Sequence, residues 1–426
     1  MPFPLAGTGN SSYSQTTPAN ARVQRLRAIC VRCRELRFHL PHDVRIYFYC
    51  RNEPGNLQED VITLAEGLKD LGISFSGNCN YWLQSTEPGD YLIKHDPEIT
   101  PDGCDIVVVS YTWPYWVESG TFRFFPQPLP EGLFKKGRRY VTVYMDSHDG
   151  HRTVSWEPEF RQFDLILRSK LNKRAWHPEN MKPWVLGFTS RILKAVESQL
   201  PFEERRRVAL VNFGASHPYP HGTRDEAAKC FLPLLADLIP FDTTKDDLTV
   251  APTDPYEKLM WDQTGERFSA SYYQRLGSSQ GVACFCGELI PPMPWRNPQQ
   301  YLVGGNKAKL KRIFFDAVGL IDPRSPRSVQ WDSFRFWEAL VGGCAAFNID
   351  LDHYGVELPV MPENWKHYIG ADLARPQKVI DRLRDEPEIL GKVAASGTEW
   401  AMRHYSPRRM AERLLDLSGA PLAAKG

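Results

Sequence analysis

The chain has 426 residues, which is more than a single hydrophobic core usually serves, so its length favours two domains. Hydrophobic residues at 42% and charged residues at 24% are typical of a globular protein, and a formal net charge of +1 creates no general field for nucleic acid or a membrane. We therefore expect no nucleic-acid partner, and a site for a polyanion must be a local cluster of cations.

The N-terminal segment is predicted to be a tail followed by a helix, residues 1–42. Residues 1–20 have nothing to bury and are expected to be disordered, without the basic start and apolar run of a signal peptide, so we expect a cytoplasmic protein. Residues 21–40 carry six arginines among aliphatic residues, which indicates a basic amphipathic helix. Such a helix either packs on its own domain or makes a weak peripheral contact with a membrane.

The nine cysteines are odd in number and scattered, which is typical of free thiols rather than of a disulfide framework. Cys30 and Cys33 have the spacing of half a metal site. Because no second pair follows to complete four ligands, we expect no metal there.

From residue 43 the pattern alternates between strands and helices. A strand at 44–50, a helix at 58–71 and a strand at 72–75 form a β-α-β start, and apolar strands follow at 105–110, 140–145 and 163–167. This predicts a Rossmann-like domain over 43–202. No GxGxxG motif follows the first strand, which argues against dinucleotide binding.

A second β-α series begins after a charged linker that we place between 187 and 207. It comprises a strand at 208–213, a helix from Thr223 through Leu238 that Thr223 can cap, and a strand at 282–286. Helices are predicted at 376–385, 387–405 and 407–417. We assign 203–406 to a second Rossmann-like domain and 407–426 to a C-terminal helix and tail.

The stretch 328–354 organises the second domain. It is predicted to form a helix at 332–340, a break at Gly342 and Gly343, and a buried strand at 344–349. Two α/β domains joined by a linker leave a cleft at the carboxyl edges of their sheets, where ligands of such sheets bind.

Three features of the second domain are candidates for that cleft. The loop 214–222 with Arg224 in the following helix either binds a phosphate or is an ordinary connection. The run Lys307, Lys309, Lys311 and Arg312 either faces a diphosphate or is a solvated face. Arg335 and Glu338, three apart on a helix, form either a salt bridge or a site in which the carboxylate accepts ribose hydroxyls.

Two motifs resemble the donor half of GT-B glycosyltransferases, most closely the bacterial group with spore-maturation-type and exostosin-like domains. The first is Y..L..S at 273–279 followed by an apolar strand, and the second is R..EAL..GC at 335–344 followed by another strand. The first turn of the second domain, a glycine followed by Y....R, also looks like that group. The resemblance covers about residues 208–415. It departs from the family in a long insert between 287 and 330.

The resemblance implies a GT-B fold, with two Rossmann-like parallel-sheet domains facing across a cleft. It also implies that Glu338 contacts the donor ribose or sugar and that basic residues hold the diphosphate. The expected donor-binding residues are Glu338, Arg335, Ser333, Gly214, Arg224, Lys307, Gly342 and Gly343.

The acceptor side is expected in the first domain. His148, with Asp146 or Asp149 to orient it, follows a predicted strand and is the candidate base for an acceptor hydroxyl. The same residues could instead form a polar turn that Asp146 caps, or ligate a divalent metal. Trp113 and Tyr115 follow another strand, where they either stack on a sugar or pack internally.

These features predict a metal-independent glycosyltransferase of the hexosyl type. It would move a sugar from a nucleotide-diphosphate donor to a hydroxyl, with no cofactor beyond that co-substrate. The alternatives are a GT-B-fold protein that binds a nucleotide or glycan without transfer, and a nucleotide-sugar epimerase of the same fold. The sequence leaves the sugar, the base, the acceptor, the stereochemistry and the oligomeric state open.

Overall fold

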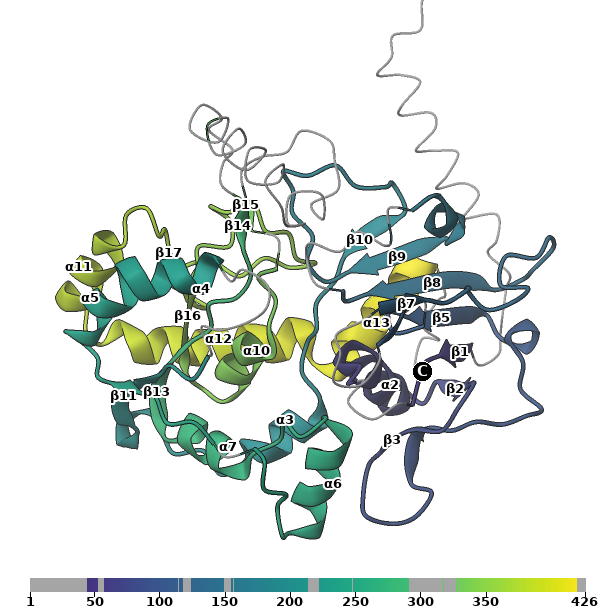
Figure 1. Ribbon diagram of the computed structural model, residues 1–426, viewed down its shortest axis with the longest axis horizontal. Coiled ribbons are helices and arrows are strands. Elements are labelled where there is room, and N and C mark those ends of the chain that lie inside the picture. The colour runs from purple at the N-terminus through teal and green to yellow at the C-terminus, as the bar shows by residue number, and fades with distance from the viewer. Residues whose placement is uncertain are drawn as a thin grey trace, which may run out of the picture.

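The structure is a computed structural model that describes residues 44–52, 57–113, 115–117, 124–148, 155, 157–213, 222–246, 248–290, 317, 327–328 and 330–419. In that part of the chain two parallel sheets occupy the two halves of the molecule (Figure 1). The predicted α/β class with two parallel-sheet units is confirmed. None of the described helices is both long and apolar enough to cross a bilayer.

The first sheet has six parallel strands, in the order β10-β9-β8-β5-β1-β2. Alternate residues of its central strands belong to two different core clusters: Ile46 and Phe48 lie in one, and Tyr47 and Val107 lie in the other. Both faces are therefore covered, as expected for a parallel sheet. The strands are β1 (Arg45–Tyr49), β2 (Ser74–Gly77), β5 (Ile106–Ser110), β8 (Val141–Asp146), β9 (Leu165–Arg168) and β10 (Met181–Pro183).

The second sheet has five parallel strands, in the order β12-β11-β13-β16-β17. Its inner strand β16 is buried along its whole length because β13 and β17 flank it and α10 and α12 pack on it. The strands are β11 (Arg206–Leu210), β12 (Phe241–Asp242), β13 (Ser279–Ala283), β16 (Ala345–Ile349) and β17 (Ile369–Ala371).

Most of the predicted helices are present, but α6 was not predicted. The helix, glycine break and strand expected within 328–354 are confirmed as α10 and β16. The described helices are α2 (Glu59–Leu71), α3 (Ser190–Ala195), α4 (Gly222–Glu226), α5 (Leu232–Ala236), α6 (Pro255–Gln263), α7 (Ala270–Gly277), α10 (Phe334–Val341), α11 (Gln377–Asp385), α12 (Ile389–Tyr405) and α13 (Pro407–Ser418). Short antiparallel pairs join β3 (Tyr81–Leu83) to β4 (Tyr91–Ile93), β6 (Tyr115–Val117) to β7 (Phe124–Pro126), and β14 (Leu289–Ile290) to β15 (Arg327–Ser328).

The helix expected from Thr223 through Leu238 is interrupted. A π-helical segment at Ala227–Phe231 separates α4 from α5. Pro233 explains the interruption, because its ring displaces the carbonyl four residues earlier and it has no N–H to donate. The predicted cap is wrong: Thr223 lies inside α4, and its N–H donates to the carbonyl of Gly287.

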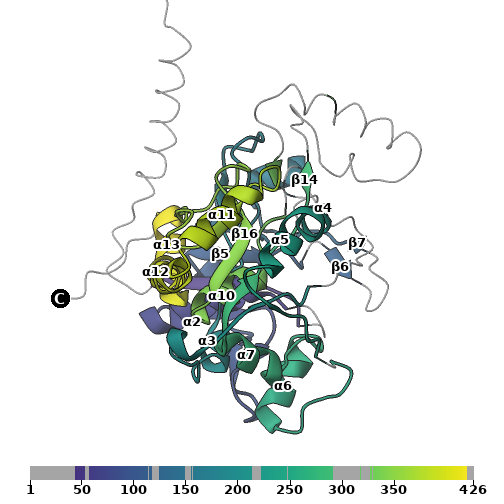
Figure 2. The same ribbon diagram turned by 90° about the vertical axis from the view of Figure 1, so that its left-hand side faces the viewer.

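We call the part of the chain that contains the first sheet the first unit and the part that contains the second sheet the second unit. The end of the chain returns to the first unit. Helix α12 packs on the second sheet, and α13 then packs against α2, beside which it lies in both views (Figures 1 and 2). Gly67 permits this contact, since a Cβ there would lie 1.9 Å from the carbonyl oxygen of Pro407. The two units are thus joined by the linker between β10 and β11 and also by this helix.

Candidate functional site

Two arginines lie close together at the carboxyl edge of the second sheet. Arg335, in the first turn of α10, donates from Nε to Oδ1 of Asn212 at 3.0 Å, just beyond the end of β11. Arg224, in α4, donates from Nε to the carbonyl of Phe285 at 3.0 Å, just beyond the end of β13. Both residues were predicted to bind the donor, and in the structure both lie at the carboxyl edge of the second sheet.

The charges of these arginines act on each other. Burial lowers the pKa of Arg224, and the positive charge of Arg335 lowers it further, although Cys286 opposes the shift. Within the described residues, no carboxylate lies within ion-pair distance of Arg335. Two like charges held together on half-buried side chains are unfavourable unless an anion joins them.

Ser333 completes this group as the N-cap residue of α10. Its hydroxyl makes no bond to the first turn of the helix, and its Oγ is buried without a partner among the described residues. The N-terminus of a helix carries partial positive charge and free N–H groups, which suit an anion. Ser333, Arg335 and Arg224 therefore define what we call the arginine site.

Glu338 lies one turn further along α10 and is buried. Its two carboxylate oxygens accept hydrogen bonds from the hydroxyls of Tyr272 (2.9 Å) and Tyr273 (3.0 Å), both on α7. Burial raises the pKa of Tyr272, and the negative charge of Glu338 adds to the rise. The i,i+3 salt bridge between Arg335 and Glu338 that the sequence allowed is not among the ion pairs of the described residues.

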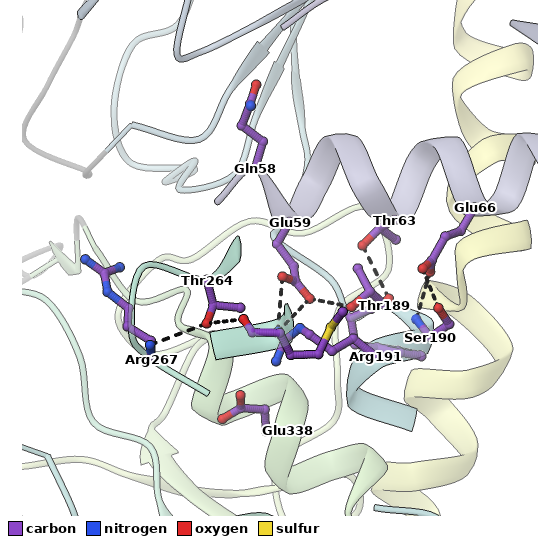
Figure 3. Close-up of polar contacts among 12 residues, drawn as sticks. Gln58, Glu59, Thr63, Glu66, Thr189, Ser190, Arg191, Thr264, Arg267 and Glu338 are labelled. Atoms are coloured by element: carbon purple, nitrogen blue, oxygen red, sulfur yellow. Dashed lines mark hydrogen bonds and ion pairs between the residues drawn. The ribbon is translucent and has the colours of Figure 1, made fainter. Parts of the chain in front are cut away.

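The tyrosine pair connects Glu338 to the first unit. The hydroxyl of Tyr273 accepts from Nη1 of Arg191 at 2.9 Å, and Nη2 of Arg191 binds both oxygens of Glu59 at 3.1 and 3.2 Å. Figure 3 shows Arg191 between Glu59 of α2 and Glu338 of α10. Burial alone would lower the pKa of Arg191, but the negative charges of Glu59 and Glu338 raise it above its usual value.

Gly342 and Gly343 lie at the other end of α10. Nη1 of Arg205 donates to their carbonyls at 2.8 and 2.7 Å, and Gly343 has a φ of 65°. A Cβ on Gly343 would lie 2.8 Å from Arg205. Because these glycines precede β16, they lie at the amino edge of the parallel sheet, the opposite edge from the arginine site. Their geometry is that of a tight turn, and their role as donor contacts stays a prediction.

Asp146 makes structural contacts within the first unit. Its Oδ2 forms an ion pair with Arg168 at 2.6 Å, in which both side chains are 0% exposed, and it also accepts from the hydroxyl of Ser155. Its Oδ1 accepts the backbone N–H of His148 at 3.3 Å. Asp146 therefore caps the turn, which was the alternative left open by the sequence.

His148 is buried, and its ring meets that of Tyr111 edge to face with 5.2 Å between centroids. Lys170 donates to the carbonyls of Ser147 and His148 at 3.2 and 3.3 Å, which fixes the backbone of this turn. The role of His148 as a base remains a prediction.

Sequence reasoning missed two buried carboxylates near this turn. Asp60 accepts a hydrogen bond from the hydroxyl of Ser147. Asp332 accepts from the backbone N–H of Leu186 and from Nε1 of Trp337, both at 2.7 Å. Burial raises the pKa of each carboxyl to about 6, while the charge of Lys170 acts in the opposite direction. The burial of Asp60 and Asp332 could not be predicted from the sequence, because acidic residues at helix starts are usually exposed.

Trp113 is packed against its own unit. Its ring contacts Tyr49 edge to face at 5.1 Å, the guanidinium of Arg51 lies 5.3 Å from its centroid, and its Nε1 donates to the carbonyl of Pro128. Tyr115 pairs through its backbone with Pro126 in a short hairpin.

The remaining candidates, Gly214, Asp149, Lys307 with its basic run, and residues 21–40, lie outside the described residues. Among the described residues, no group of three or more His, Cys, Asp or Glu side chains could hold a metal ion.

A separate cavity of about 320 Å³ opens where β16 and β17 end. Its carboxylates are already engaged: Asp350 accepts from Asn364 at 3.0 Å, and Asp372 pairs with Arg375 at 2.7 Å. None of the residues of the arginine site lines it.

No protein-family model and no curated protein matches the chain. Among solved structures, a glycosyltransferase from Rickettsia africae is 10% identical, with a TM-score of 0.47 over 90% of this chain and 100% of its own. HepE from Anabaena, in complex with UDP and glucose, is 12% identical, with a TM-score of 0.40 over 88% of this chain and 98% of its own.

Proposed function

We propose that the protein is a GT-B-type glycosyltransferase that binds a nucleotide-diphosphate sugar on its second unit and transfers the sugar to a hydroxyl. The arginine site is the observation that carries this proposal. Arg224 and Arg335 come from two different helices, and Arg335 has no carboxylate partner in the described part of the chain. A diphosphate would neutralise both charges and accept from the Ser333 hydroxyl and the free N–H groups of α10.

The proposed role of the arginine site is to stabilise the leaving group. As the bond between the anomeric carbon and the diphosphate oxygen breaks, negative charge grows on that oxygen. Guanidinium groups and a helix N-terminus fixed in place stabilise this charge without reorganising. We propose that they do so without a metal ion, since both cations are supplied by side chains.

Glu338 is the proposed contact for the donor ribose, as the resemblance implies. Each carboxylate oxygen accepts one tyrosine hydroxyl and keeps a second acceptor direction. The tyrosines would fix the orientation of the carboxylate, and Arg191 would fix Tyr273. The donor contact would then be connected through Glu59 to the first unit.

The acceptor is proposed to approach from the first unit. Its hydroxyl oxygen forms the new bond to the anomeric carbon and loses its proton to a base. His148 remains the candidate for that base because it follows β8 at the carboxyl edge of the first sheet. Asp146 does not orient the imidazole in this proposal, since the ion pair with Arg168 occupies it.

Transfer is tested by incubating the full chain with UDP-, GDP- and ADP-sugars, with and without a panel of sugar acceptors, and measuring the released nucleoside diphosphate. Release that increases when an acceptor is added and is lost in Arg335→Gln supports the proposal. Conversion of the donor to an epimer would instead support the epimerase. Nucleotide binding without any turnover would support the binding protein.

A further inference from the structure

Two cysteine thiols lie side by side at the carboxyl edge of the first sheet. Sγ of Cys50 is 3.8 Å from Sγ of Cys79, and Cys79 can also donate to the carbonyl of Cys50 at 3.5 Å. Both cysteines are free thiols in the structure. Cys50 is fully buried, whereas Cys79 is partly exposed.

The parallel register holds the two residues opposite each other. Phe48 of β1 is the partner of Gly77 of β2, so two residues further on Cys50 faces Cys79. Oδ1 of Asn78 accepts the N–H of Cys50 at 2.8 Å, which continues the pairing past the strand ends. Adjacent strands lie about 4.8 Å apart, which is within the range of Cα separations that a disulfide spans.

The environment distinguishes the two thiols. The hydrogen bond from Cys50 lowers the pKa of Cys79, and the backbone N–H of Asn52 adds to this effect, while burial opposes it. The pKa of Cys50 is raised by the same hydrogen bond and by burial. A partly exposed thiol with a lowered pKa beside a second thiol is the usual arrangement of a redox-sensitive pair.

We propose that Cys79 is a site of oxidative modification by hydroperoxides and that Cys50 is its resolving thiol. The Cys79 thiolate attacks the peroxide, so that an S–O bond forms, the O–O bond breaks and the second oxygen leaves as water or alcohol. Cys50 then attacks the sulfur of Cys79, the S–S bond forms, and the hydroxyl leaves as water. The peroxide is reduced by two electrons and the pair is oxidised by two.

The disulfide would form beside the predicted acceptor side. Cys50 is followed by Arg51, whose Nε and Nη2 donate to the carbonyl of Trp113 at 3.3 and 3.1 Å. The cross-link would fix the start of the segment that carries Arg51. The modification itself does not depend on the proposed transfer activity and is tested without it.

The test treats the full chain with hydrogen peroxide, unfolds it in denaturant so that buried thiols are accessible, alkylates the remaining thiols and maps the cysteines by mass spectrometry. We expect Cys50 and Cys79 to escape alkylation together, in a linked peptide pair that has lost two hydrogens and is restored by dithiothreitol. In Cys50→Ser we expect a sulfenic acid on Cys79 that dimedone traps. Cys230→Ser, which removes another partly exposed thiol, should leave the pair unchanged.

The proposal is overturned if both thiols remain alkylatable in the peroxide-treated wild type while Cys230 reacts. It is also overturned if Cys79 forms its disulfide with a cysteine other than Cys50. Circular dichroism of each variant before treatment shows whether it is folded. Because the wild-type arm needs no substitution, a variant that fails to fold leaves the test intact.

Discussion

Nη2 of Arg191 binds both carboxylate oxygens of Glu59, at 3.1 and 3.2 Å, where the two side chains are almost fully removed from solvent. The pair ties α2 of the first unit to α3 of the linker, and Thr189 adds a hydrogen bond of 2.6 Å to the same carboxylate. Through Tyr273, the pair reaches Glu338 in the second unit. Removing either charge leaves the other buried without its ion-pair partner.

We therefore expect Glu59→Gln and Arg191→Met each to lower the free energy of unfolding by about 3 to 5 kcal/mol, as is usual when a buried pair is broken. The measurement is chemical denaturation followed by circular dichroism. The double variant should lose less than the sum of the two single losses, because no lone charge remains. Arg403→Gln, which breaks an exposed pair with Glu399 on α12, is the control and should change stability little. Additive losses in the double variant would contradict this account.

Gly67 should be sensitive to substitution. A Cβ there would meet backbone atoms of Pro407, which cannot move without displacing α13, so Gly67→Ala should cost about 1 to 3 kcal/mol of stability. Gly103→Ala is the matched control, because a Cβ at that position meets nothing within 4 Å and its φ is not positive. Thermal unfolding of the two variants provides the comparison, and equal melting temperatures would argue against the close packing of α13 on α2.

The pH dependence of stability should show the buried carboxyl of Asp332. Its pKa in the folded state is raised from 3.8 to about 6, so between these pH values the folded protein holds a proton that the unfolded chain has released. The contribution of Asp332 to stability therefore rises as pH falls from about 7 to about 4. In Asp332→Asn this contribution is absent, so the stability of the variant relative to wild type should be highest at pH 7 and fall toward pH 4. A constant difference across that range, measured by urea denaturation, would contradict the raised pKa.

Tyr272 and Tyr273 test whether Glu338 is connected to Arg191 through hydrogen bonds. Tyr272→Phe and Tyr273→Phe each remove one hydroxyl from the carboxylate, and Tyr273→Phe also removes a partner of Arg191. We expect Tyr273→Phe to destabilise the protein more than Tyr272→Phe, by about 1 kcal/mol or more, because it leaves a buried guanidinium N–H unpaired. Denaturation curves provide the measurement, and the reverse order would contradict the connection through Arg191.

The sequence was sufficient for elements whose signals are local. The apolar runs of β1, β5 and β8, the helical spacing of α2 and the glycine break between α10 and β16 all correspond to the structure within a few residues. The π-helical segment before α5 was missed because an uninterrupted apolar pattern outweighed the single proline.

The site was only partly accessible from the sequence, because it depends on contacts between distant residues. Arg224 and Arg335 could be named from their motifs, but their proximity depends on the order of β11 and β13 in the sheet. That Asp146 is paired with Arg168 follows only from the neighbouring positions of β8 and β9. Asp332 could not be identified as buried, since the residues that cover it come from the linker and from α10.

The central claim is that the arginine site binds a nucleoside diphosphate. Isothermal titration of the full chain with UDP, GDP and ADP tests it directly, with Arg335→Gln as the variant and Arg403→Gln, an exposed arginine elsewhere, as the control. We predict saturable binding of at least one nucleotide to the wild type and to the control. Arg335→Gln should weaken that binding about tenfold or more, as expected for the loss of a charged hydrogen bond. Absence of binding to the folded wild type, or equal affinity in Arg335→Gln, would contradict the account.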